Sequence, residues 1–416
     1  MAEMDTPERI RTGFGLKREI ASWLDRDYSS SLVELIKARD YRLEVGNTRV
    51  LLAREFGFCY GVDRAIEYAY ETVKRFPDRN VYLTGEIIHN PHVNDTLRAM
   101  GVGFLAGPHA DPRGVDAVAP GDVVILPAFG VTVAVLDRLA RAKATLVDTT
   151  CGSVLNVWKN VERYAREGMT SLIHGKYAHE ETLATCSRVT EVLGGRYLVV
   201  RDLAEAEVVA SFIRHGGSRE DFLAHFARAA SPGFDPEQHL GRIGVANQTT
   251  MLSTESLAIA DLVRRALLDR HGEAEMGQRF RSFDTICSAT QDRQDAIEAL
   301  VREGLDLMLV VGGYNSSNTN HLTEIAARAT RGYHIEDATC LVDCARIRHQ
   351  PFGTRGEIEG AGWLPAGPIT VGISAGASTP NSRVGGVIER ILELRGVAVA
   401  DLLAEAQGVA VPPPTA

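Results

Sequence analysis

The chain has 416 residues, enough for about two or three domains with cores of their own. Apolar residues make up 45% of the sequence and charged residues 24%, as in an ordinary globular protein. The formal net charge is −9, and no sustained run of lysine and arginine occurs. This balance argues against a nucleic-acid-binding surface, but a local pocket for a small anion stays possible.

No apolar run reaches the roughly 18 to 20 residues that a membrane span requires. The acidic N-terminus resembles neither a secretory signal nor a transit peptide. We therefore expect a cytoplasmic protein with no membrane segment and no nucleic-acid partner.

An N-terminal extension, residues 1–47, precedes the body of the chain. Residues 16–24 and 31–38 have the apolar spacing of short amphipathic helices, the second after a serine run suited to capping. The simplest interpretation is a packing arm, and a lid or a partner-docking segment is the alternative.

The body alternates predicted strands with predicted helices. The apolar segments predicted as strands are 49–53, 81–84, 122–126, 144–147, 171–174, 197–200, 242–246, 307–311 and 369–373. The helical patterns between them include 62–76, 133–142, 154–166, 254–269, 291–303, 320–329 and 381–394. This alternation implies parallel sheets covered by helices. Nine strands are enough for one sheet, but three similar cysteine loops spread along the chain favour three smaller α/β units.

Two segments look peripheral. Residues 215–241 are rich in glycine, proline and charge and are predicted to form a surface insertion. The tail, 397–416, ends in a proline run at 412–414, and its last residues are expected to fray.

The chain has six cysteines and no Cys-x-x-Cys pair, so disulfides, zinc ribbons and thioredoxin motifs are not expected. Cys59, Cys151 and Cys287 each follow a strand or extended segment, stand beside small residues and precede a helical pattern. Three thiolates without a fourth suit an iron–sulfur cluster with one open iron, or a catalytic zinc. The alternative is that they are buried structural thiols. Cys186 is predicted to be packed, and Cys340 and Cys344, spaced like neighbours on a helix face, are weaker ligand candidates.

Several polar loops follow predicted strands. His89 lies in segment 85–92, where it could donate to a phosphate. Segment 174–182 places a histidine for anion binding beside a glutamate for proton transfer, although a solvated charged loop is the alternative.

Three more polar loops, 247–250, 312–320 and 374–380, offer hydroxyls and amides after strands, and the last two precede helices. Helix N-termini with such donors bind anions, and no Walker loop is present. Ordinary helix caps explain each loop singly, but together with His89 and His179 they suit a diphosphate.

These segments together resemble the 4-hydroxy-3-methylbut-2-enyl diphosphate reductase family, the last enzymes of the methylerythritol phosphate route to isoprenoids. The resemblance covers about 49–394, in order. The motifs that carry it are FCYGVDRA (58–65), EIIHNP (86–91), VDTTC (147–151), HGKYAHEET (174–182), NQTT (247–250), TICSATQDRQ (285–294), NSSNTN (315–320) and AGASTP (375–380).

The resemblance implies a fold of three small parallel-sheet α/β domains in a pseudo-threefold arrangement around a central iron–sulfur cluster. The expected domains are 60–149, 150–285, and 48–59 together with 286–396. The implied cofactor is a [4Fe-4S] cluster with three ligands, Cys59, Cys151 and Cys287, and one open iron.

The implied reaction is reductive dehydroxylation of (E)-4-hydroxy-3-methylbut-2-enyl diphosphate to isopentenyl and dimethylallyl diphosphates. The implied partners are this allylic diphosphate and a one-electron donor, ferredoxin or flavodoxin. Glu181 matches the family's proton donor, and Thr249 matches the threonine near the substrate hydroxyl. The residues matching the substrate pocket are His89, His179, Gln248, Thr250, Ser316, Ser317, Asn318 and Ser378, of which Gln248 and Thr250 are the weaker matches.

Two features qualify the resemblance. Phe129 stands where many bacterial members have a histidine, so the remaining donors must bind the diphosphate or another side chain must replace it. This phenylalanine, segment 174–182 and the N-terminal extension are typical of the plant and cyanobacterial branch. Glu180 and Glu181 are adjacent candidates, and the family spacing from the histidine selects Glu181.

Two other functions compete with this one. A quinolinate-synthase-like dehydratase also uses three thiolates and three α/β units, but the diphosphate-type loops and segment 174–182 argue against it. A non-catalytic iron–sulfur sensor or carrier needs no proton donor beside an anion pocket.

Overall fold

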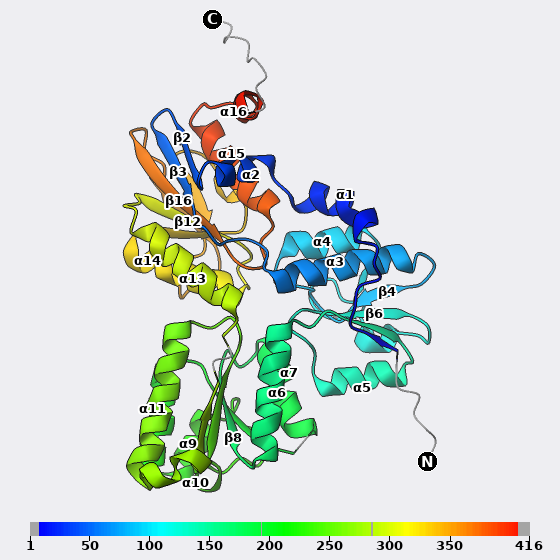
Figure 1. Cartoon of the computed structure of the whole chain (residues 1–416), viewed down its shortest axis with the longest axis vertical. Coiled ribbons are helices and arrows are strands. Elements are labelled where there is room, and N and C mark those ends of the chain that lie inside the picture. Colours follow the sequence, from blue (N-terminus) through cyan, green and yellow to red (C-terminus); the bar gives the residue numbers. More distant parts are fainter. Residues whose placement is uncertain (1–7, 193, 284–285, 407–416) are drawn as a thin grey trace, which may run out of the picture. The chain divides into compact units, whose positions relative to one another are not determined.

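The computed structural model describes residues 8–192, 194–283 and 286–406. Strands and helices alternate along the chain and form three mostly parallel sheets and a small hairpin (Figure 1). The predicted loop before the third cysteine includes Asp284 and Thr285, which lie outside the described residues, as does the proline run of the tail.

The chain divides into two compact units. The first holds the residues up to Phe14, Arg64–Ile88 and Asn94–Cys287. The second holds Gly15–Asp63, His89–Val93 and the residues from Ser288 onward.

The first sheet lies in the first unit, with strand order β1-β7-β6-β4-β5 and only parallel pairings. Its strands are β1 (Arg9–Ile10), β4 (Val81–Leu83), β5 (Gly103–Phe104), β6 (Val123–Leu126) and β7 (Thr145–Asp148). The helices along this part of the chain are α3 (Tyr60–Arg75), α4 (Pro91–Ala99), the 3-10 turn η1 (Gly114–Ala117) and α5 (Val133–Arg141). β6 and β7 are buried along their whole length, as in parallel sheets covered on both faces.

The second sheet also lies in the first unit, with order β11-β10-β8-β9 and only parallel pairings. Its strands are β8 (Thr170–His174), β9 (Arg196–Val200), β10 (Ile243–Asn247) and β11 (Phe280–Ser282). The helices around it are α6 (Gly152–Arg166), α7 (Glu180–Ser187), the π-helical turn η2 (Arg188–Val192), α8 (Leu203–His215), α9 (Arg219–His225), α10 (Pro236–His239), α11 (Ser253–His271), η3 (Glu273–Glu275) and α12 (Met276–Arg279).

Two apolar clusters cover the second sheet. One joins its strands to α8 and α11, and the other joins them to α6, where Tyr164 is fully buried. A Cβ at Gly244 of β10 would lie 2.3 Å from the Tyr164 ring, so only glycine lets α6 approach this closely. More than half of the residues in segment 215–241, predicted as a surface insertion, are exposed, but Phe222, Phe226 and Phe234 are buried in the first cluster. The spacing of these aromatics was a core signal that glycine and charge obscured.

The third sheet lies in the second unit, with order β13-β12-β16-β3-β2. Only β2 is antiparallel to its neighbour. Its strands are β2 (Arg42–Val45), β3 (Thr48–Leu52), β12 (Leu307–Val311), β13 (Arg331–Ile335) and β16 (Ile369–Ala375), and a hairpin is formed by β14 (Arg346–His349) and β15 (Ile358–Ala361). The helices are α1 (Lys17–Tyr28), α2 (Ser31–Ala38), α13 (Ser288–Val301), α14 (Ser317–Ala329), the turn η4 (Ala338–Cys340), α15 (Asn381–Leu394) and α16 (Val399–Ala406).

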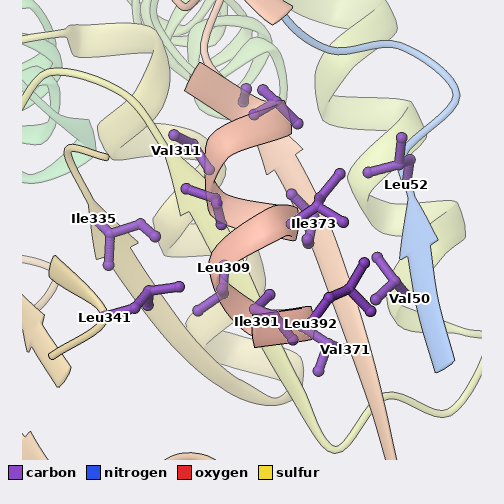
Figure 2. Packing of buried hydrophobic residues seen from close by; sticks show 14 of the residues in the cluster. Val50, Leu52, Leu309, Val311, Ile335, Leu341, Val371, Ile373, Ile391 and Leu392 are labelled. Atoms are coloured by element: carbon purple, nitrogen blue, oxygen red, sulfur yellow. The ribbon is translucent and has the colours of Figure 1, made fainter. Parts of the chain in front are cut away.

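Alternation along β12 sorts its side chains between two helical layers. Leu309 and Val311 face the cluster that α2 and α15 complete, whereas Met308 and Val310 face the cluster of α13 and α14. Figure 2 shows part of the cluster formed with α2 and α15, with residues of α15 packed against β16 and β3. α2 therefore belongs to the helical layer that covers one face of the third sheet.

The predicted fold class, α/β with three small and mostly parallel sheets, is confirmed. The nine predicted strands correspond to β3, β4, β6, β7, β8, β9, β10, β12 and β16, with three in each sheet. The strands missed by the prediction include β1, β2, β5, β11 and β13, which all lie at sheet edges. These five strands are short or partly exposed, so they lack the apolar run that marks a central strand. Among the described residues, no helix combines the length and apolar character that a membrane crossing requires.

Candidate active site

Three cysteines lie where a helix follows a strand. Cys59 comes after β3, Cys151 after β7 and Cys287 after β11, and the next residue begins α3, α6 or α13. All three are partly exposed and free of disulfides. A helix N-terminus stabilises a thiolate, so each thiol is placed to act as a metal ligand. Cys59 belongs to the second unit and the other two to the first.

The other three cysteines lie in different settings. Cys186 is buried in α7, as predicted, and burial raises the pKa of its thiol. The spacing of Cys340 and Cys344 suggests one helix face, but this prediction is wrong, because Cys340 ends the short turn η4 and Cys344 lies beyond it. Burial raises the pKa of Cys340, and Cys344 is exposed.

An arginine holds the Cys59 loop within the second unit. Arg293 on α13 is 4% exposed. Its guanidinium donates to the carbonyl of Gly57 from Nη2 at 2.8 Å and Nε at 3.2 Å, and to that of Phe58 at 3.1 Å. The backbone N–H of Cys59 donates to the carbonyl of Ala377 at 3.3 Å. A buried cation therefore fixes the backbone just before the first cysteine.

The Cys151 turn has a similar support within the first unit. Arg64 on α3 donates from Nη2 to the carbonyls of Thr150 at 2.6 Å and Thr149 at 3.3 Å. The backbone N–H of Cys151 donates to the carbonyl of Ala128 at 2.8 Å. Sequence reasoning missed Arg64 and Arg293 as site residues. Their signal was present, since Arg64 follows Cys59, and Arg293 follows Cys287, by about one and a half helical turns.

A buried carboxylate lies beside the third cysteine. Glu181, on the first turn of α7, is 2% exposed. Its Oε1 accepts from the backbone N–H of Thr249 at 2.6 Å, and its Oε2 accepts from the Thr249 hydroxyl at 3.0 Å. The carbonyl of Thr249 in turn accepts from the backbone N–H of Cys287 at 3.4 Å. Glu180 is exposed, so the structure distinguishes the two adjacent glutamates by burial.

His179 is the N-cap of α7, and its Nδ1 accepts from the backbone N–H of Glu181 at 3.2 Å. A neutral ring in this arrangement carries its proton on Nε2, which makes Nε2 a donor. Phe129 meets His179 edge-on, with ring centroids 6.3 Å apart. An apolar ring therefore lies beside His179.

Gln248 joins two loops of the first unit. Its Oε1 accepts from the backbone N–H of Lys176 at 3.0 Å and from the Thr182 hydroxyl at 3.2 Å. Its Nε2 donates to the Thr250 hydroxyl at 2.7 Å. These bonds occupy both ends of the amide, so Gln248 and Thr250 support the backbone around Thr249.

A second group of polar residues lies in the second unit, at the N-terminus of α14. Ser316 caps the helix by accepting from the backbone N–H of Thr319. The Ser378 hydroxyl lies 3.4 Å from that of Ser316 and donates to the carbonyl of His89 at 3.2 Å. Asn318 Oδ1 accepts from the backbone N–H of Ala377 at 2.9 Å. Three predicted substrate-pocket residues, Ser316, Asn318 and Ser378, thus form one group with the backbone of His89.

Two donors in this group have no hydrogen-bond partner among the described residues, namely Ser317 Oγ and Asn318 Nδ2. Ser317 and Asn318 are 2% and 3% exposed. An unpaired buried donor costs about 1–3 kcal/mol, so such groups are rare unless a ligand completes them. A Cβ at Gly376 would lie 2.0 Å from the Thr319 hydroxyl, so glycine is required for the loop to pack here. The group suits an anion with several oxygens.

His174 has no place in this chemistry. It is fully buried, and its Nδ1 lies 2.7 Å from the Ser256 hydroxyl, which makes it a core histidine. Asn90 was also missed by sequence reasoning. Its amide donates to the carbonyl of Ser378 at 2.8 Å and supports the polar group of the second unit.

Together, these features define an α/β enzyme whose chemical groups lie at the carboxyl ends of parallel strands. Comparison with known proteins identifies the family to which this chain belongs. The family model of the LytB protein matches residues 50–392, and the chain belongs to this family.

Two relatives are named 4-hydroxy-3-methylbut-2-enyl diphosphate reductase. The protein from Gloeobacter violaceus is 49% identical over 398 residues, which cover 95% of this chain and 94% of the relative. The protein from Thermosynechococcus vestitus is 48% identical over 389 residues, which cover 93% and 95%. These cyanobacterial sources agree with the branch that the sequence motifs predict.

Two solved structures are also similar. One, described as (E)-4-hydroxy-3-methyl-but-2-enyl diphosphate reductase, the terminal enzyme of the non-mevalonate pathway, aligns with a TM-score of 0.51 at 28% identity. The alignment covers 83% of this chain and 99% of that structure. The other, from Plasmodium falciparum, has a TM-score of 0.59 at 20% identity, over 84% of this chain and 90% of that one, and supports the fold.

Proposed function

We propose that this chain reduces (E)-4-hydroxy-3-methylbut-2-enyl diphosphate to isopentenyl and dimethylallyl diphosphates. The observation that carries the proposal is the hydrogen-bonded link from Glu181 through Thr249 to the backbone of Cys287. It places a buried carboxyl group beside a candidate metal ligand, as proton delivery at a metal-bound substrate requires. The names of two relatives about half identical over nearly the whole chain support this substrate and reaction.

We assign Cys59, Cys151 and Cys287 as the ligands of a [4Fe-4S] cluster with one open iron. The donor set fits, because these three thiols lie partly exposed at helix N-termini, whereas Cys186 and Cys340 are buried. When bound, such a cluster supplies electrons and a Lewis-acidic iron for the substrate hydroxyl. Zinc takes a similar ligand set but is redox-inert, so it does not serve a reductive reaction.

Glu181 is the proton donor in this proposal. Two electrons and two protons replace the allylic C–O bond with a C–H bond and release the oxygen as water. Thr249 holds both carboxyl oxygens of Glu181, so the carboxyl group keeps one orientation. Because the residue is nearly inaccessible to solvent, its carboxyl group is kept away from bulk water.

The diphosphate is bound by the donors at the N-terminus of α14 and by the two histidines. Ser317 and Asn318 bring donors that the described residues leave unpaired, and the positive end of the helix macrodipole favours an anion. Ser316 and Ser378 complete the hydroxyl set, and His89 and His179 supply ring N–H groups. Phe129 brings no donor, so the serine and asparagine side chains carry more of the diphosphate than they would beside a third histidine.

Several further assignments belong to the same proposal. The electrons come from a one-electron donor protein, ferredoxin or flavodoxin, and the enzyme works in the cytoplasm. The three α/β domains, 60–149, 150–285, and 48–59 with 286–396, surround the cluster in a pseudo-threefold arrangement. With these bounds, Cys59, Cys151 and Cys287 each lie within two residues of a domain boundary.

The test is anaerobic reconstitution with iron and sulfide, followed by turnover of the substrate with a one-electron reductant. A colourless protein with zinc in place of iron would remove the cluster assignment. A coloured protein that consumes no substrate would favour an iron–sulfur sensor or carrier. A quinolinate-synthase-like dehydratase would leave the allylic diphosphate untouched and would bind a dicarboxylate instead.

A further inference from the structure

The N-terminal strand β1 lies against the strand that leads to Cys151. β1 pairs with β7 in parallel, with Arg9 opposite Leu146 and Ile10 opposite Val147. The backbone N–H of Leu146 donates to the carbonyl of Glu8 at 2.8 Å. β7 ends at Asp148, three residues before Cys151. Residues 9–10 are thereby part of the first sheet and lie at the edge beside the strand that leads to the cysteine turn.

Two arginines of this segment meet the buried carboxylate of Asp148. The Asp148 side chain is 1% exposed. Its Oδ2 lies 2.7 Å from Arg9 Nη2 and accepts from the Nε groups of Arg9 and Arg11, both at 3.0 Å. Burial by itself raises the pKa of Asp148, but the hydrogen bond from Thr150 and the charges of Arg9 and Arg11 lower it by more, and the net pKa lies below its ordinary value.

The other carboxylate oxygen holds the cysteine turn. Asp148 Oδ1 accepts from the backbone N–H of Thr150 at 3.1 Å and from the Thr150 hydroxyl at 2.5 Å. Asp148 therefore connects the arginines, through one oxygen, to the residue directly before Cys151, through the other. Arg64 fixes the carbonyl side of the same turn.

The N-terminal segment is attached independently of its arginines. The backbone N–H of Phe14 donates to Glu71 Oε2, and the Phe14 ring packs edge-on against Phe76 with centroids 5.5 Å apart. Replacing the arginines therefore leaves β1 with its backbone pairing on one side and the Phe14 anchor on the other. The family match begins at residue 50, so Arg9 and Arg11 lie outside it while Asp148 lies inside.

We propose that Arg9 and Arg11 are positioning residues for Cys151. They compensate the buried charge of Asp148, so that its second oxygen holds the Thr150 turn and keeps the thiol in one orientation. This inference rests on the proposed function in one respect, the assignment of Cys151 as a cluster ligand. It gives the N-terminal extension a role at the metal site, beyond packing.

The test compares R9Q/R11Q with the parent and with R9Q/R11Q/D148N, each in the 416-residue chain. After anaerobic reconstitution, iron release to a colorimetric chelator is followed with time. Removing one side of a buried ion pair leaves an uncompensated charge, so R9Q/R11Q is expected to release iron about tenfold faster than the parent. The triple variant removes the charge as well and is expected to return to within about twofold.

The matched control is R113Q/R138Q, which removes two exposed arginine–aspartate pairs of the same unit. Exposed pairs contribute little, so this variant should release iron at the parent rate. Equal release from R9Q/R11Q and the parent would overturn the proposal. The proposal would also be overturned if R9Q/R11Q/D148N released iron as fast as R9Q/R11Q while circular dichroism showed that all variants are folded.

A second readout does not need the cluster. In iron-free protein, iodoacetamide labelling resolved by peptide mass spectrometry gives the relative reactivity of each cysteine. The Cys151-to-Cys59 labelling ratio should change about threefold or more in R9Q/R11Q and recover in the triple variant. An unchanged ratio would refute the positioning role whether or not the chain is a reductase. If the parent does not turn over the allylic diphosphate but the labelling ratio still changes in R9Q/R11Q, only the proposed function is refuted.

Discussion

Replacing Glu181 with glutamine separates proton delivery from folding and cluster binding. The carboxylate accepts two hydrogen bonds, from Thr249 N and from the Thr249 hydroxyl. A glutamine keeps one oxygen for the backbone N–H, and its amide nitrogen can donate to the hydroxyl, which then turns to accept. The shape and the hydrogen-bond count are therefore preserved, and the group that takes up and delivers the proton is lost.

The size of each effect follows from this geometry. Exchanging two charge-assisted bonds for neutral ones costs about 1–3 kcal/mol. Removing a nearly inaccessible carboxylate gives back a similar amount in desolvation, so the free energy of unfolding should change by no more than about 1 kcal/mol. Turnover should fall by about 10²–10⁴, the usual contribution of a positioned general acid.

The assay is anaerobic consumption of the allylic diphosphate with a one-electron reductant, at matched iron content. Glu180→Gln is the control, because the neighbouring side chain is exposed, and it should retain turnover within about twofold. If E181Q keeps turnover close to that of the parent, or if E180Q loses it, the assignment of Glu181 is wrong.

Two further predictions concern buried charges. Arg293→Met leaves the carbonyls around Gly57 without their buried donor, so urea unfolding should show a loss of about 2–4 kcal/mol and reconstituted iron content should fall; unchanged values for both would contradict the support of Cys59 by Arg293. Burial lowers the pKa of His334 to about 4. Because the unfolded chain takes up the proton near pH 6.5, the stability from the neutral ring is complete above that pH and is lost as the pH falls toward 4. Urea unfolding should show a loss of about 2 kcal/mol from this group between pH 7.5 and pH 5, and His334→Gln should reduce the pH dependence by that amount; an equal slope in both proteins would refute it.

Central strands could be predicted from the sequence because each is an apolar run bounded by turn residues. β12, whose five residues are all buried, is an example. The pairing of β1 with β7 could not be predicted, because a two-residue strand has no periodic signal and its partner lies far away in sequence. Long-range pairing depends on the tertiary fold and not on local preference. The contact of Arg9 with Asp148 could not be predicted for the same reason, because the two residues are far apart in sequence.

The candidate site shows the same division. The loops that hold Cys59, Cys151 and Cys287 could be located from local sequence, because small residues and helix starts mark them. The supports of these loops could not, since Arg293 and Asp148 act through tertiary contacts. Burial is also a tertiary property, and adjacent residues such as Glu180 and Glu181 differ in it only once the helix is packed.

The proposed reaction is tested most directly by its products. Cluster-replete, reduced protein is incubated without oxygen with (E)-4-hydroxy-3-methylbut-2-enyl diphosphate, and the products are separated and identified. We expect the substrate to be consumed and isopentenyl and dimethylallyl diphosphates to appear together, with two electrons used for each molecule. Recovery of unchanged substrate from protein with its full iron content would contradict the proposed reaction.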